Sequence, residues 1–153
     1  MERADEVCDA LRFLVKAGIV DYNGHASARL GRGFVVNGAA SDRAAPRPDQ
    51  LCVASLEGTA TDGPRPPNEA HLHAAIYRAR PEVGAVAHGH PRWLCALSAA
   101  GVPLAPVTPQ AAVLGELPTY PHGHSISSRG RGEAVAACLG AAKGAVLRGH
   151  GIV

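Results

Sequence analysis

The chain has 153 residues, a formal net charge of +2, 46% hydrophobic residues and 18% charged residues. A chain of this length and balance can bury a core of its own, which excludes a disordered protein. The small net charge, the lack of a Lys/Arg block and an aromatic content of 4% argue against nucleic acid as a partner.

The N-terminal sequence and the cysteines indicate neither export nor a membrane. MERADEVCDA opens with charged residues and lacks the apolar segment of a signal peptide. No stretch approaches the roughly 18 apolar residues that a membrane-spanning helix needs. The four cysteines lie more than forty residues apart, which favours buried free thiols over disulfides. We therefore expect a cytoplasmic protein with no membrane partner.

The first part of the chain predicts one helix and three short strands. Apolar residues recur at three- and four-residue spacing from Glu2 to Ala17, which predicts an amphipathic helix that ends at Gly18. The strands are expected at residues 27–30, 34–36 and 51–54. Residues 59–67 are expected to form a loop.

The second part of the chain alternates between helices and strands. Asn68 is a suitable N-cap for a helix from Glu69 to about Arg80. Further helices are predicted at 93–100 and 128–141 and strands at 83–87 and 145–147, with room for a short strand around Leu104 and a loop at 117–124. This alternation predicts an α/β protein, and no linker divides residues 1–153.

Three histidines follow the apolar strands. His88 and His90 stand two apart after the strand at 83–87, so an extended backbone points both to the same side. His150 follows the apolar run that ends at Arg148. Three imidazoles with an open position are typical of a catalytic zinc site. The alternative is a loop with two exposed histidines.

A glycine turn precedes the first predicted strand. Asn23-Gly24 marks the turn, and His25 and Ser27 follow it. Such a turn can present backbone N–H groups to an anion. The alternative, which the residues alone favour, is a turn that only connects two elements.

Four stretches resemble the class II aldolase/adducin family. They are GHASARL at 24–30, NEAHLHAAIYRARPEV at 68–83, AVAHGHP at 85–91 and LRGHGIV at 147–153. Their order and separations identify the chain as a member of this family. The resemblance implies a three-layer α/β/α fold around a mostly antiparallel sheet, and a homotetramer. It also implies that the C-terminal helices of the family are missing from this chain.

The resemblance implies a metal site and a catalytic carboxylate. The ligands of one zinc ion per chain would be His88, His90 and His150, and Glu69 would move protons beside the metal. The alternative for Glu69 is a helix N-terminal acid that the helix dipole stabilises. His73, one turn later, is expected to be a core or supporting histidine. His122 and His124 repeat the H-x-H spacing but are not expected to bind metal.

Substrate contacts are expected at four residues, namely Gly24, His25, Ser27 and Asn68. Members that bind phosphate carry Asn where this chain has His25, and small hydroxyl residues where it has Pro67 and Asn68. Aldolases of the family use a tyrosine as proton donor, whereas residues 107–110 contain none. These departures disfavour a sugar phosphate and the usual aldol cleavage.

The function expected from the resemblance is that of a zinc-dependent carbon–carbon lyase of the aldehyde-lyase type. Its substrate would be a small sugar or keto acid, with or without a phosphate group, as in pentose catabolism. An epimerase or a decarboxylase that uses the same metal site is the alternative. A non-catalytic, adducin-like assembly module is an alternative from a different class.

Overall fold

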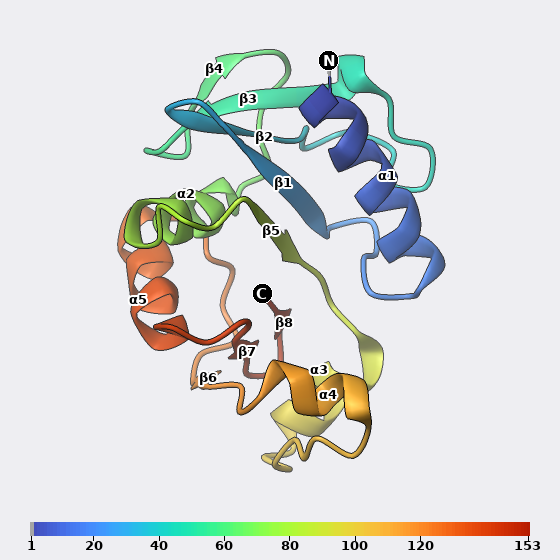
Figure 1. Cartoon of the computed structure of the whole chain (residues 1–153), viewed down its shortest axis with the longest axis vertical. Helices are drawn as coiled ribbons and strands as arrows, with labels where there is room; N and C mark the ends of the chain where they lie inside the picture. The colour runs from blue at the N-terminus through green and yellow to red at the C-terminus, as the bar shows by residue number, and fades with distance from the viewer. Residues whose placement is uncertain (1) are drawn as a thin grey trace.

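The computed structural model describes residues 2–153, and its centre is a five-stranded antiparallel sheet. The strands lie in the order β4-β3-β2-β1-β5, and helices cover both faces (Figure 1). Their bounds are β1 His25–Leu30, β2 Gly33–Asn37, β3 Leu51–Ser55, β4 Ala60–Asp62 and β5 Ala85–His88. This is the predicted three-layer α/β/α arrangement.

The residues of β1 alternate between the two faces of the sheet. Ala26 and Ala28 face the N-terminal helix, whereas Ser27 faces the opposite layer. Each strand neighbour of β1 is antiparallel, and β1 pairs His25 with His88 of β5. This pairing brings the glycine turn next to the first histidine after the apolar strand.

Helix α1 (Glu2–Lys16) covers one face of the sheet, as its apolar spacing predicts. Val7, Cys8 and Leu11 are buried against small side chains of β1 and against other apolar side chains of the sheet. Gly18 follows the helix with a φ of 70°, a left-handed conformation that glycine adopts readily.

Helices α2 (Ala70–Ala79) and α5 (Arg129–Leu139) form the layer on the other face. Leu72 and Ile76 of α2 are buried together with Phe34 of the sheet and Val135 of α5. Gly132 lets the two helices approach closely, because a Cβ atom there would lie 2.4 Å from the carbonyl oxygen of His71.

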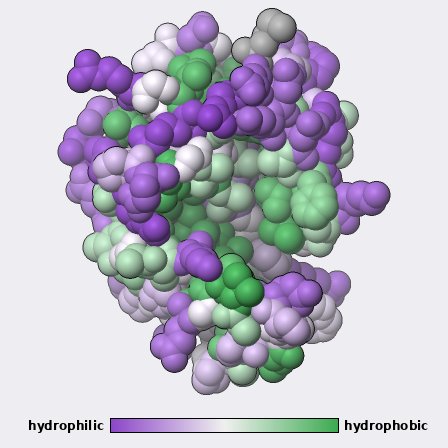
Figure 2. Space-filling model, in the orientation of Figure 1, coloured by the Kyte–Doolittle hydropathy of each residue, from purple (hydrophilic) through white to green (hydrophobic). Residues whose placement is uncertain are grey.

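The elements after β5, apart from α5, form a C-terminal extension of this body. They comprise α3 (Arg92–Ala99), α4 (Pro109–Leu114) and a small sheet of β6 (Thr119–Tyr120), β7 (Val146–Leu147) and β8 (Gly151–Ile152). The side chains of Trp93, Val107 and Val113 are 73%, 86% and 68% exposed, and apolar surface is visible at the lower end of the molecule (Figure 2).

Several short elements and one cap differ from the sequence predictions. Four elements were not predicted because they have only two to six residues each, too few for a periodic pattern. They are strands β4, β6 and β8 and helix α4. A 3₁₀ helix at Pro48–Gln50 leads into β3. No strand forms around Leu104. The predicted N-cap Asn68 is wrong, because Glu69 occupies the N-cap position and its carboxylate points into the site instead of capping the helix.

The cysteines are free thiols, as their spacing predicts. All four cysteines are free, Cys8 and Cys52 being buried and Cys95 and Cys138 half-buried. None of the helices in residues 2–153 has the length and hydrophobicity that a membrane crossing requires.

Candidate metal centre

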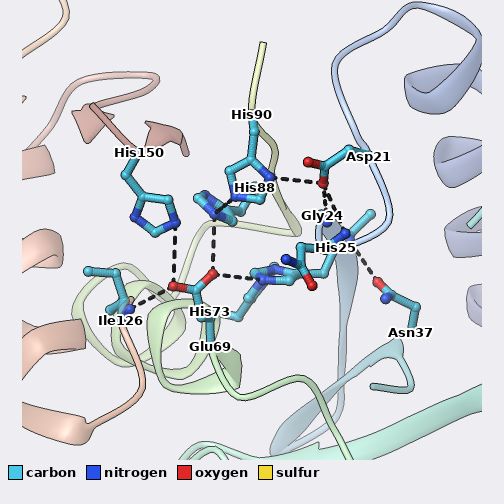
Figure 3. Close-up of polar contacts among 12 residues, drawn as sticks. Asp21, Gly24, His25, Asn37, Glu69, His73, His88, His90, Ile126 and His150 are labelled. Atoms are coloured by element: carbon cyan, nitrogen blue, oxygen red, sulfur yellow. Dashed lines mark hydrogen bonds and ion pairs between the residues drawn. The ribbon is translucent and has the colours of Figure 1, made fainter. Parts of the chain in front are cut away.

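Four side chains from distant parts of the chain converge on one point (Figure 3). Glu69 stands at the start of α2, His88 ends β5, His90 lies just beyond it and His150 lies in the turn between β7 and β8. One ligand atom from each of these residues lies within 4.8 Å of the others. All three histidines predicted from the sequence, and the predicted carboxylate, therefore belong to one cluster.

Backbone pairing between Gly89 and Ile152 brings His150 to the other two histidines. The amide of Gly89 donates to the oxygen of Ile152 at 3.2 Å, and the amide of Ile152 donates to the oxygen of Gly89 at 3.0 Å. Glycine is required at both crossing points. A Cβ atom at Gly89 would lie 2.3 Å from the oxygen of Ile19, and one at Gly151 would lie 2.3 Å from the oxygen of Gly89.

The rings of His88 and His90 are oriented by acceptors behind them. Nδ1 of His88 lies 3.0 Å from the carbonyl oxygen of Ile152, and Nδ1 of His90 lies 2.9 Å from Oδ1 of Asp21. Because these oxygens only accept, each Nδ1 carries a proton, and Nε2 is the nitrogen that each ring turns toward the cluster.

The donor set fits a divalent cation. The two Nε2 atoms of His88 and His90 are 3.0 Å apart, and two lone pairs facing each other at this distance repel unless a cation or a proton lies between them. Imidazole nitrogens and a carboxylate are ordinary zinc ligands, with metal–ligand distances of about 2.0–2.2 Å. His88, His90, His150 and Glu69 are therefore the residues that could hold a metal ion.

The carboxylate of Glu69 is 8% exposed and collects several donors. Oε1 accepts from the amide of Ile126 at 2.6 Å, and Oε2 lies 3.3 Å from Nε2 of both His25 and His88. Burial alone raises the pKa of Glu69, but the hydrogen bond from Nε2 of His25 and the one from the Ile126 amide outweigh burial. The pKa therefore falls well below its ordinary value, and Glu69 is an anion.

A cavity of about 290 Å³ opens beside the cluster. Of the predicted substrate residues, His25 and Asn68 line this cavity, whereas Gly24 and Ser27 do not. The amides of Asn23 and Gly24 already donate to Oδ1 of Asp21, at 2.9 and 3.1 Å. These two amides are therefore no free N–H pair for an anion, although Asn23 itself lines the cavity.

Two residues that surround the site were missed by the sequence analysis. Asp21 orients His90, and Arg43 lines the cavity from the loop after β2. Neither stands in a motif, because each reaches the site through a loop whose path only the tertiary structure fixes.

The other histidines lie where the sequence analysis placed them. His73 is fully buried and contacts His25 and Ser27, which makes it a supporting residue. The rings of His122 and His124 stack on each other beside Tyr120 and are outside the cluster of ligand candidates.

Known proteins are similar to this chain in both sequence and fold. Residues 5–153 match the family described as Class II Aldolase and Adducin N-terminal domain. The 3,4-dihydroxyphthalate decarboxylase of Terrabacter sp. (strain DBF63) is 35% identical, over 95% of this chain and 68% of that protein. The L-fuculose phosphate aldolase of Methanococcus maripaludis (strain C5 / ATCC BAA-1333) is 30% identical, over 69% of this chain and 56% of that protein.

Solved structures agree with this relationship. The crystal structure of L-fuculose-1-phosphate aldolase from Thermus thermophilus superposes with a TM-score of 0.84 at 25% identity, covering 99% of this chain and 78% of that one. The chain thus spans about half to three quarters of the length of these proteins. From the matched residues and the shared fold, this chain belongs to the class II aldolase and adducin N-terminal domain family.

Proposed function

We propose that this chain is the metal-binding domain of a carbon–carbon lyase that acts on a small hydroxylated substrate, with zinc as the metal. The observation that carries this proposal is the convergence of Glu69 with the three histidines within 4.8 Å. When bound, the ion would supply Lewis-acid stabilisation of the negative charge left on a substrate oxygen as the adjacent carbon–carbon bond breaks.

Glu69 performs the proton transfer in this proposal. Its carboxylate is an anion held by His25 and the Ile126 amide, so it starts as a base. It takes the proton of a substrate hydroxyl group as the bond breaks, and returns that proton to the carbon that has kept the bonding electrons. The cavity beside Glu69 gives a small substrate access to this carboxylate.

Decarboxylation is the form of this reaction that we favour. The relative that matches 95% of the chain is a decarboxylase of a hydroxylated aromatic acid. The residues 107–110 also lack the tyrosine that the aldol route of this family would use. The leaving fragment is then CO₂, which requires no further proton donor in the domain.

Aldol cleavage is the second candidate. It is supported by the similarity to L-fuculose phosphate aldolases in both sequence and structure. The same carboxylate would act as the base, but a different carbon–carbon bond would break, and the released fragment would be an aldehyde. Product analysis separates the two reactions, because only decarboxylation releases the carbon of a labelled carboxyl group as gas.

The proposal is tested by measuring metal per chain in the purified native protein and in His88→Ala. We expect about one zinc per chain in the native protein and none in the variant. His122→Ala, which removes an exposed histidine of the same H-x-H spacing, is the matched control and should keep its zinc.

Activity is then assayed with carboxyl-labelled 3,4-dihydroxyphthalate and with L-fuculose 1-phosphate. Release of labelled CO₂ that is lost in His88→Ala supports decarboxylation, and release of aldehyde supports aldol cleavage. A folded native chain that binds no metal would contradict the lyase and favour a non-catalytic assembly module.

A further inference from the structure

Arg43 is a buried cation without an anionic partner. Its side chain lies in the loop after β2 and is 7% exposed. No carboxylate among residues 2–153 forms an ion pair with it, and Asp21 and Asp42 act on its charge only from a distance. A buried charge normally carries a partner, because removing it from water costs several kcal/mol.

The guanidinium of Arg43 has only part of its donors occupied. Nε donates to the carbonyl oxygen of Gly24 at 3.1 Å. Nη1 donates to the carbonyl oxygen of Ala39 at 3.2 Å and to Ser41. Nη2 has no hydrogen-bond partner within residues 2–153, although it carries two N–H groups. The chain thus fixes the orientation of the group and leaves one end free.

Arg43 is also part of the wall of the cavity beside the metal centre. Arg43 lines this cavity together with Glu69, His90 and His150, so one small molecule can contact both the cluster and the arginine. The volume of about 290 Å³ is at the lower end of the range for ligand pockets. The cavity therefore suits a compact substrate.

A second arginine lines the same cavity. Arg65 also lines it and is exposed to solvent. The amide of Ala39 donates to the carbonyl oxygen of Arg65 at 2.8 Å, while the carbonyl oxygen of Ala39 accepts from Arg43. The backbone of Ala39 thus holds together the two loops that carry the arginines.

We propose that Arg43 and Arg65 bind a carboxylate of the substrate while another part of the same molecule lies at the cluster of Glu69 and the three histidines. This inference rests on the proposed lyase function. It names the substrate class as a hydroxylated acid that has a carboxylate besides the group that reacts at the cluster. Guanidinium groups pair with carboxylates through parallel N–H···O bonds.

The charge of the cavity favours a carboxylate over a phosphate. A phosphate monoester brings a charge of about −1.5 to −2 and three acceptor oxygens. The cavity offers no lysine, its glycine turn has no free amides, and Glu69 adds a negative charge. The two N–H groups of Nη2 in Arg43 point in diverging directions, so one of them can donate to an oxygen of a singly charged carboxylate while Arg65 pairs with the same group.

The test is the affinity of the native protein for phthalate and for phenyl phosphate, measured by calorimetry with and without zinc. Phthalate carries two adjacent carboxylates and no hydroxyl group, so it binds without reacting. We expect phthalate to bind more tightly than phenyl phosphate. Its Kd should rise by roughly 10- to 100-fold in Arg43→Gln and less in Arg65→Gln.

Arg47→Gln is the matched control, because Arg47 is exposed in the same loop, pairs with Asp49 and does not line the cavity. Its phthalate affinity should equal that of the native protein. The side chain of Arg65 makes no hydrogen bond within residues 2–153, so Arg65→Gln carries the test if Arg43→Gln does not fold.

Three results would overturn the carboxylate site. The first is that the folded native protein does not bind phthalate. The second is that the native protein and both cavity variants bind phthalate equally. The third is that phenyl phosphate binds more tightly than phthalate. A protein that binds phthalate through these arginines but has neither metal nor lyase activity would keep this inference and contradict the proposed function.

Discussion

His73 Nε2 lies 2.6 Å from Nδ1 of His25, and neither ring is more than 1% exposed. The other ring nitrogen of His73, Nδ1, lies 2.7 Å from Oγ of Ser27. That oxygen lies 2.8 Å from the hydroxyl oxygen of Tyr77. On the other side, Nε2 of His25 lies 3.3 Å from Glu69. A continuous chain of hydrogen bonds thus connects the core with the carboxylate of the site.

Only one arrangement of protons satisfies this chain. The ionised carboxylate of Glu69 accepts, so His25 carries its proton on Nε2 and must accept on Nδ1. His73 then donates from Nε2 and accepts from Ser27. We therefore predict that 15N spectra of the metal-free protein show both His25 and His73 protonated on Nε2 alone.

Two variants test the two links that Ser27 makes in this series of hydrogen bonds. Ser27→Ala removes the donor to His73 and should mix the tautomers of both histidines. Tyr77→Phe should leave the tautomers unchanged, because Ser27 can still donate. A native spectrum with the proton of His25 on Nδ1 would contradict the arrangement.

Acid should destabilise the metal-free protein well before its carboxylates titrate. Burial lowers the pKa of His25 to about 4 and lowers that of His73 well below the ordinary 6.5. Below pH 6.5 the unfolded chain therefore binds protons at these two histidines that the folded protein does not bind. Their contribution to the free energy of unfolding is complete above this pH and is lost as the pH falls. Each histidine contributes up to about 1.4 kcal/mol per pH unit.

The pH window distinguishes the histidines from Glu69. Glu69 has a pKa lowered from 4.5, so its contribution is present above pH 4.5 and lost only below that value. Urea unfolding of the metal-free protein between pH 7.5 and 4.5 measures the histidine effect. A free energy of unfolding that stays constant over this window would rule it out.

Asp21→Asn should weaken metal binding without removing a ligand. Asp21 accepts from Nδ1 of His90 at 2.9 Å and so orients the ring and increases its basicity. Loss of such a partner typically costs about 10- to 100-fold in metal affinity. Zinc affinity is measured by competition with a chelator, and Asp42→Asn, in an exposed loop, is the control. Equal zinc affinity in native protein and Asp21→Asn would contradict this role.

Gly132→Ala should loosen the contact between α2 and α5. A Cβ atom there meets the backbone oxygen of His71 at 2.4 Å, so one helix must shift. Overpacking of this kind costs about 1–3 kcal/mol. Gly130→Ala, two residues earlier in the same helix, meets nothing within 4 Å and should stabilise by up to about 1 kcal/mol. Thermal unfolding of both variants measures the difference, and equal stability would contradict the close approach.

The homotetramer stays a prediction. The exposed apolar side chains on and beside α3 and α4, among them Trp93 and Val107, are surface that assembly could cover. Light scattering should give four times the chain mass of 15.7 kDa. A monomer at micromolar concentration would contradict the prediction.

The sequence determined the larger elements of the fold, because their signals are local. The apolar stripe of α1 and the apolar residues of β5 are read from neighbouring residues. Strands of two or three residues, such as β6 and β8, leave no such pattern. They form because backbone groups of distant segments pair.

The same distinction holds for the site. H-x-H and the glycine-flanked His150 identified the histidines, because residue spacing and family resemblance are contained in the sequence. Only the tertiary structure joined Gly89 to Ile152, placed Asp21 behind His90 and brought Arg43 into the wall of the cavity. These relationships depend on how loops pass over the sheet, and the energies of such long-range contacts are not encoded in any short stretch of the chain.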